Sequence, residues 1–170
     1  MIFVTIGTQI PFDRLIEMLD RIAPELDEEI YAQALRGKYK PKHFKLVDFI
    51  EPDEFEKVFA QARLIVAHAG MGTILSALRK SKPLIIFPRI AALGEHRNDH
   101  QSATALMIKE KQYAYVATDE EELRELLHKE LRPLKSIGEF ASESLINSLK
   151  DFIDFNAYIN YKTLRLCQTK

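Results

Sequence analysis

Residues 64–78, LIVAHAGMGTILSAL, predict a strand, a tight turn and a helix in succession. The opening apolar residues suit a strand buried on both faces, and apolar residues recur at helical spacing after Thr73. Gly70 and Gly72 can adopt positive φ and allow close backbone approach, so the amides of the first helical turn can point at a ligand. The helix dipole favours an anion there. The turn therefore predicts a phosphate cradle, although two glycines at such a turn often serve packing alone.

Strands and helices alternate along the chain on both sides of this turn. The other expected strands are the short apolar runs at residues 2–6, 29–34, 45–50, 84–87 and 114–116. Amphipathic stretches lie between them, with apolar residues at helical spacing around Leu15, Phe59 and Leu126. The pattern predicts a three-layer α/β/α Rossmann-like fold with a parallel sheet. Thr118 is the expected N-cap of the helix that contains Leu126.

The pattern changes after Pro133. An apolar stripe from Glu139 to about Tyr161 predicts a C-terminal helix. We therefore expect a sheet domain over residues 1–137 and a helical extension over residues 138–170. The extension either docks on the chain's own sheet, which is the favoured interpretation, or contacts a partner.

A second polar cluster follows the next expected strand after the glycine turn. The strand at 84–87 leads into Pro88 and Arg89, and then into GEHRNDHQ at residues 94–101. Carboxyl ends of parallel strands meet at one edge of the sheet, where open α/β sheets bind ligands. We therefore expect this cluster to share a crevice with His68, which can offer a ring N–H or, when protonated, a charge.

The composition excludes several classes of partner. The 170 residues include 24 Lys and Arg against 25 Asp and Glu, a net charge of −1, so no overall positive field would recruit nucleic acid. Cys167 is the single cysteine, which excludes an internal disulfide and favours the reducing cytoplasm. No apolar run is long enough to cross a bilayer, and residues 1–6 are interpreted as a first strand and not as a signal peptide.

Four segments, taken together, carry a family resemblance. They are FVTIGT at 3–8, HAGMGT at 68–73, KPLIIFPR at 82–89 and GEHRNDHQ at 94–101. In this order they resemble the C-terminal, donor-binding domain of family 28 glycosyltransferases, the C-terminal half of the GT-B fold, over residues 1 to about 130. Within that family the chain is similar to the PssE-type subunits of two-component exopolysaccharide and capsule glycosyltransferases.

The resemblance implies a role in polysaccharide biosynthesis. The chain would bind a UDP-sugar carrying galactose or N-acetylglucosamine, and would transfer the sugar with inversion to a lipid-linked acceptor, using no cofactor and no obligatory metal. A membrane-anchored, PssD-like subunit would supply the acceptor-binding half and recruit the chain to the inner face of the cell membrane. The length fits this division, because one sheet domain cannot form a two-domain cleft by itself.

The resemblance also implies which residues meet the donor. The glycine turn would contact the diphosphate, and His100 with Gln101 stands where relatives contact sugar hydroxyls. Ser76 departs from the family pattern, because many relatives carry there a glutamate that bonds the ribose. The implied substrate-binding residues are Gly7, Thr8, His68, Gly70, Met71, Gly72, Thr73, Ser76, Arg89, His100 and Gln101.

Several alternatives stay open at this point. Glu95 and His96 are the in-chain candidates for the general base that inverting transfer needs, unless the partner supplies it. Glu95, His96, Asp99 and His100 also resemble a metal cluster, although no zinc-protease pattern surrounds them. A non-catalytic nucleotide-binding regulatory module of the same fold is the rival function. The basic run at residues 36–43 is interpreted as a solvated loop, with a partner or membrane surface as the less favoured contact.

Overall fold

A parallel sheet forms the centre of the structure, a computed structural model that describes residues 1–7 and 10–137. Within those residues, all six expected strands are present, each inside its predicted limits. They are β1 (Ile2–Thr5), β2 (Ile30–Gln33), β3 (Lys45–Val47), β4 (Leu64–Ala67), β5 (Leu84–Ile86) and β6 (Tyr115–Val116). The strand order is β3-β2-β1-β4-β5-β6, and every neighbouring pair is parallel. This arrangement confirms the expected α/β Rossmann-like fold.

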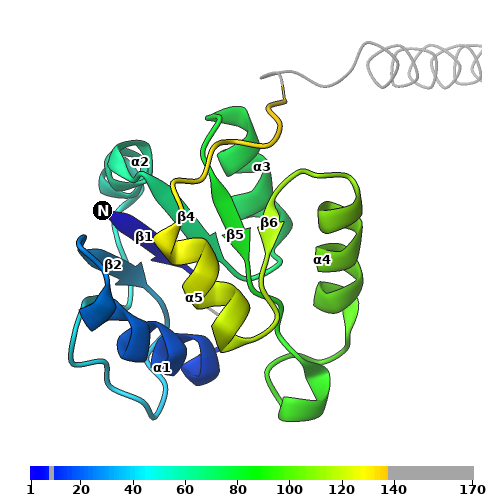
Figure 1. The fold of residues 1–170 in the computed structure, drawn as a ribbon. Helices are drawn as coiled ribbons and strands as arrows, with labels where there is room; N and C mark the ends of the chain where they lie inside the picture. The colour runs from blue at the N-terminus through cyan, green and yellow to red at the C-terminus, as the bar shows by residue number, and fades with distance from the viewer. Residues whose placement is uncertain (8–9, 138–170) are drawn as a thin grey trace, which may run out of the picture. The chain divides into compact units, whose positions relative to one another are not determined.

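Helices cover both faces of this sheet (Figure 1). They are α1 (Asp13–Ile22), α2 (Pro52–Gln61), α3 (Met71–Arg79), α4 (His100–Glu110) and α5 (Glu120–His128). The sequence analysis did not predict α4. Its apolar residues do not form one stripe, because Ala105 and Ile108 are buried whereas Leu106 is 60% exposed. The helix therefore lacks the periodic signal on which the other helices were identified.

The side chains of each strand alternate between two hydrophobic layers, as the pleat requires. In β1, Ile2 and Val4 pack with α1 and α5 on one face, whereas Phe3 packs on the opposite face with Phe59 of α2 and Ile74 of α3. Figure 1 shows α1 and α5 together on the nearer side of the sheet. Both faces are therefore covered, which explains why the strands are continuously apolar.

The N-cap of α5 differs from the one expected from the sequence. Thr118 is not the N-cap of α5: the cap is Asp119, whose carboxylate accepts a hydrogen bond from the Glu122 N–H at 2.8 Å. A charged carboxylate also complements the positive end of the helix dipole.

The expected C-terminal helix from Glu139 lies outside the described residues. Among the described helices, none has the length and apolar character needed to cross a bilayer.

The sheet has its switch point between β1 and β4. Chain order runs outward from β1 through β2 to β3, and then resumes on the other side of β1 with β4, β5 and β6. Connections leaving the carboxyl ends of β1 and β4 therefore diverge, and such a divergence opens a crevice at that edge. The loop after β1 contains Gly7, and the turn after β4 contains His68.

Candidate functional site

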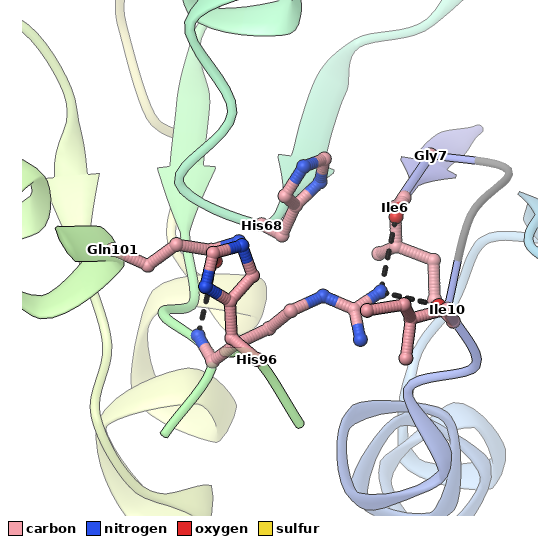
Figure 2. A pocket seen from close by; sticks show the side chains of 7 residues that line it. Ile6, Gly7, Ile10, His68, His96 and Gln101 are labelled. Carbon is pink, nitrogen blue, oxygen red and sulfur yellow. Dashed lines mark hydrogen bonds between the residues drawn. The ribbon is translucent and has the colours of Figure 1, made fainter. Parts of the chain in front are cut away.

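A pocket of about 340 Å³ opens at this switch point. Its lining comes from the loops after β1, β4 and β5 and from the first turn of α4: Ile6, Gly7, Ile10, His68, Arg89, His96 and Gln101. Figure 2 shows Ile6, Gly7 and Ile10 on one side of the pocket and Gln101 on the other. Five of these seven residues were candidates from the sequence, so the two polar clusters do converge.

Arg89 organises the loop after β1. Its side chain is buried, with 3% exposure, and its Nη2 donates hydrogen bonds to the carbonyl oxygens of Ile6 at 3.2 Å and Ile10 at 2.6 Å. Its Nη1 donates to the carbonyl oxygens of Pro11 at 2.7 Å and Glu95 at 3.3 Å. Burial lowers the pKa of Arg89, with Glu95 acting in the opposite direction, but guanidinium groups stay charged in proteins. Arg89 therefore contributes a fixed positive charge, and its terminal nitrogens donate hydrogen bonds to backbone carbonyl oxygens.

Gln101 and Glu95 hold the segments around Arg89 in place. The buried Gln101 side chain accepts a hydrogen bond from the Arg89 backbone N–H at 3.2 Å. Glu95 forms a two-pronged ion pair with Arg14, at 2.7 Å to Nε and 2.8 Å to Nη2. The same carboxylate accepts the Ile90 backbone N–H at 2.8 Å. Both oxygens of Glu95 are thus occupied by contacts that fix the loop after β5.

His68 is a neutral side chain in this pocket. Burial, together with smaller electrostatic contributions from Arg89 and His96, lowers the pKa of His68 to about 4, although a backbone hydrogen bond with Thr5 acts in the opposite direction. At neutral pH the ring is therefore unprotonated, so it offers one donor and one acceptor but not the charge considered from the sequence. The Nδ1 atom is enclosed and has no hydrogen-bond partner among the described residues.

The start of α3 lies directly after His68, and its two glycines act differently from the prediction. Neither has positive φ; in the described chain Gly7 and Gly94 are the glycines that do, at 73° and 72°. Gly70 is needed because a Cβ there would overlap the His68 ring, whereas a Cβ on Gly72 would meet nothing within 4 Å. No side chain in the described residues caps the helix. The amides of its first turn therefore have no side-chain acceptor among the described residues.

The remaining candidates lie around the pocket or beyond it. Met71, Thr73 and Ser76 belong to α3, with Met71 48% exposed and the other two half-buried. His100 begins α4 and is exposed. Thr8 lies outside the described residues. Of the described candidates, Met71, Thr73, Ser76 and His100 do not line the pocket itself.

The metal alternative finds no support in the geometry. Glu95 is paired with Arg14, and Asp99 accepts the Ala91 backbone N–H at 3.1 Å. Among the described residues, no group of three or more His, Cys, Asp or Glu side chains is arranged to hold a metal ion.

Ile6 and Ile10 are pocket residues that the sequence analysis did not identify. Ile6 ends the expected first strand, and Ile10 stands just before Pro11. The backbone carbonyl oxygens of both residues also accept hydrogen bonds from Arg89. Apolar residues beside a first strand are typical of core, so residue type alone gave no signal. Their position at the carboxyl end of β1, next to the switch point, is the feature that identifies them.

Comparisons with known proteins agree with this architecture. The chain is similar in structure to ALG13 in its solution structure, with a TM-score of 0.53 and 19% identity over 87% of this chain and 93% of that one. MurG of Acinetobacter baumannii gives a TM-score of 0.56 and 21% identity over 74% of this chain and 41% of that one. At such identities the likeness establishes the fold, which is that of the C-terminal domains of GT-B glycosyltransferases.

Two curated relatives share more sequence. One is the UDP-N-acetylglucosamine–N-acetylmuramyl-(pentapeptide) pyrophosphoryl-undecaprenol N-acetylglucosamine transferase of Cytophaga hutchinsonii, 31% identical over 108 residues. The other is the UDP-N-acetylglucosamine transferase subunit ALG13 of Mus musculus, 30% identical over 106 residues. These matches cover 64% and 56% of this chain, but only 27% and 9% of the relatives' own lengths.

The family comparison covers most of the chain. The glycosyltransferase family 28 C-terminal domain matches residues 1–155, which include every strand of the sheet and the whole pocket. The segments that suggested this family from the sequence all lie within the match. The chain therefore belongs to glycosyltransferase family 28 and carries its C-terminal domain.

Proposed function

We propose that the chain is the donor-binding subunit of an inverting glycosyltransferase that uses a UDP-sugar carrying N-acetylglucosamine or galactose. The observation that carries the proposal is the placing of the uncapped α3 start beside a pocket with a buried cation, Arg89. Family membership supports glycosyl transfer as the chemistry. Both curated relatives described above are named for UDP-N-acetylglucosamine, which favours that donor over UDP-galactose.

In this proposal the diphosphate lies at the start of α3. The amides of Met71, Gly72 and Thr73 donate to its oxygens, and the missing side chain of Gly72 leaves the required space. Developing negative charge on the leaving UDP is stabilised by these amides, by the helix dipole and by the field of Arg89. The proposal assigns contacts with sugar hydroxyls to Gln101 and His100, at the start of α4, and a contact with a ribose hydroxyl to Ser76. Neither a cofactor nor a metal ion is part of this mechanism.

The general base is assigned to His96 or to the partner. His96 lines the pocket, and its Nδ1 lies 3.1 Å from the carbonyl oxygen of Asn98, which leaves Nε2 for an acceptor hydroxyl. Glu95 is the weaker candidate because Arg14 and the Ile90 N–H occupy its oxygens. Among the described residues that line the pocket there is no carboxylate.

A second subunit completes the site in this proposal. It is membrane-anchored and PssD-like, binds the lipid-linked acceptor, and holds this chain at the cytoplasmic face of the membrane for polysaccharide synthesis. The name of one relative, a UDP-N-acetylglucosamine transferase subunit, supports this division.

Calorimetric titration with UDP and a panel of UDP-sugars tests the donor site. We expect UDP to bind and UDP-N-acetylglucosamine to bind more tightly than UDP-glucose. Absence of binding by every uridine nucleotide would overturn the proposal.

Transfer of labelled sugar to a lipid-linked acceptor, measured after co-expression with a candidate partner, tests catalysis. Because no pocket carboxylate is available in the described chain, a regulatory module is the specific rival: it predicts UDP binding without transfer by any pair. His96→Gln should abolish transfer and spare UDP binding, whereas the exposed His128→Gln should change neither. Full transfer by His96→Gln would assign the base to the partner.

A further inference from the structure

Arg14 stands in the first turn of α1, and its guanidinium reaches the loop that follows β5. Its Nε donates to Glu95 Oε1 at 2.7 Å, and its Nη2 donates to Glu95 Oε2 at 2.8 Å and to the Pro88 carbonyl oxygen at 2.9 Å. The guanidinium carbon also lies 4.7 Å from the centre of the Phe87 ring and 5.3 Å from that of Phe12. Arg14 is therefore held by a carboxylate, a carbonyl and two aromatic rings at once.

The ion pair between Arg14 and Glu95 is shielded from water. The two side chains are 19% and 11% exposed. Paired hydrogen bonds between a guanidinium and a carboxylate fix both the distance and the orientation of the two groups. The pair therefore joins α1 to the loop after β5 more firmly than an exposed ion pair would.

Glu95 in turn fixes the backbone of that loop. Its Oε2 accepts the Ile90 N–H at 2.8 Å, and its own N–H donates to the Ile90 carbonyl oxygen at 3.3 Å. The carbonyl oxygen of Glu95 accepts a hydrogen bond from Arg89 at 3.3 Å. The side chain, the N–H and the carbonyl of Glu95 thus all have partners, so the chain is held in place at residue 95.

His96 follows directly and lines the pocket (Figure 2). Its Nδ1 lies 3.1 Å from the carbonyl oxygen of Asn98. Because a carbonyl oxygen can only accept, this hydrogen bond requires a proton on Nδ1 and leaves Nε2 as the acceptor of the neutral ring. An unprotonated nitrogen is what a general base needs. The place of the ring and its tautomer both depend on the loop that Glu95 fixes.

We propose that Arg14 is a positioning residue, which acts through Glu95 to hold His96 in the pocket with Nε2 unprotonated. Without the guanidinium, the shielded Glu95 carboxylate is an unpaired charge, so it turns towards water and releases the Ile90 N–H. The loop then loses its side-chain closure, and the His96 ring is no longer fixed. The use of this arrangement in catalysis rests on the proposed function, whereas the place and tautomer of the ring do not.

The tautomer of His96 is read from long-range proton–nitrogen NMR correlations of the full chain at about pH 8.5, where imidazole in water is neutral. We expect a proton on Nδ1 in the parent chain. Arg14→Gln should give a mixture of tautomers at His96 and at least about tenfold faster hydrogen exchange of the Ile90 amide. Arg21→Gln is the matched control, because Arg21 also lies on α1 and bonds a carboxylate, that of Glu120, at 2.6 Å. It should change neither measurement.

A double variant tests whether the effect passes through Glu95. Glu95→Gln removes the charge and keeps an oxygen that can accept the Ile90 N–H. Arg14→Gln/Glu95→Gln should therefore recover much of the Nδ1 protonation that Arg14→Gln loses, whereas a general loss of packing around α1 would not be repaired. Arg14→Lys keeps the charge without the planar fork and should show the same changes to a smaller extent, which keeps the test valid if Arg14→Gln does not fold. Circular dichroism checks the fold of every variant.

Three NMR outcomes would each overturn the positioning role. They are a parent His96 without a proton on Nδ1, parent-like spectra in both Arg14 variants, and no recovery in the double variant.

Transfer kinetics and UDP titration separate this role from the proposed donor site. Arg14→Gln should lower kcat about tenfold to a hundredfold, because a displacement of about 1 Å can cost that much, and should leave the Kd for UDP within about threefold. Full transfer by Arg14→Gln would overturn the catalytic use of the arrangement. Failure of the parent chain to bind UDP would contradict the proposed function, while the NMR result would still decide whether Arg14 positions His96.

Discussion

Replacing Arg89 by methionine removes the guanidinium and keeps an unbranched side chain of similar length. Four hydrogen bonds to the carbonyl oxygens of Ile6, Ile10, Pro11 and Glu95 disappear together. Each hydrogen bond from a charged donor contributes about 1.5–3 kcal/mol. The cost of burying the cation is relieved at the same time. The expected net loss in the free energy of unfolding is therefore about 3–5 kcal/mol, the range found when one partner of a buried ionic network is removed.

Urea denaturation at neutral pH, followed by circular dichroism, measures this loss. Arg97→Met is the matched control, because Arg97 is exposed in the same loop and its replacement should change stability by no more than about 0.5 kcal/mol. Arg89→Lys keeps the charge but lacks the planar fork, so an intermediate loss of about 2 kcal/mol is expected.

The proposed donor site also predicts how UDP affinity changes in the same variants. Arg89→Met should weaken UDP binding together with stability, because the loop after β1 loses its anchor. A stability loss below about 1 kcal/mol, or one equal to that of Arg97→Met, would refute the positioning role. Loss of UDP affinity at unchanged stability would show instead that Arg89 contacts the ligand directly.

Four further predictions concern the candidate site. Gly72→Val should reduce UDP affinity at least a hundredfold by calorimetry while the free energy of unfolding stays within about 1 kcal/mol, since the added atoms enter open space; unchanged affinity in the folded variant would contradict the phosphate assignment. Gly70→Ala should instead cost about 1–3 kcal/mol in urea denaturation because it displaces the His68 ring. The pKa of His68 is about 4 when folded against an ordinary 6.5, so the unfolded chain binds the extra proton and stability falls as pH drops from 6.5 towards 4. Between pH 7 and pH 5 the parent chain should lose ~2 kcal/mol more of its free energy of unfolding than His68→Gln does. Equal losses in the two proteins would show that the pKa of His68 is not lowered by folding. UDP-sugar affinity should be unchanged in excess EDTA, and a tenfold loss would require a metal.

The sheet was predictable because its strands are buried on both faces. A continuous apolar run such as residues 64–67 is typical of a strand buried on both faces, and the alternation of such runs with amphipathic stretches indicated a parallel sheet. The strand order was not predicted. Helix α4 was not predictable by periodicity, since Leu106 points to solvent between buried neighbours. The N-cap of α5 was misplaced by one residue because Thr118 and Asp119 both suit that position.

The location of the candidate site was predictable from the sequence, but the hydrogen-bond and ion-pair partners of its side chains were not. Parallel topology alone brings His68 and Arg89 to one edge, as expected. The side-chain partners depend on how loops pack, and local spacing does not record that packing. Gly70 leaves room for the His68 ring and does not adopt the expected positive φ. Glu95 is bound by Arg14, 81 residues earlier in the chain.

The way Arg89 is bound has a consequence for how the pocket selects a ligand. Its terminal nitrogens bond carbonyl oxygens, so they have little capacity to read the shape of a bound group. What remains is a long-range potential, which attracts any anion of suitable size. Discrimination among donors must then come from contacts of short range and defined direction. In the proposed donor site, evolution or protein engineering could change the accepted sugar at such contacts while the Arg89 charge is left untouched.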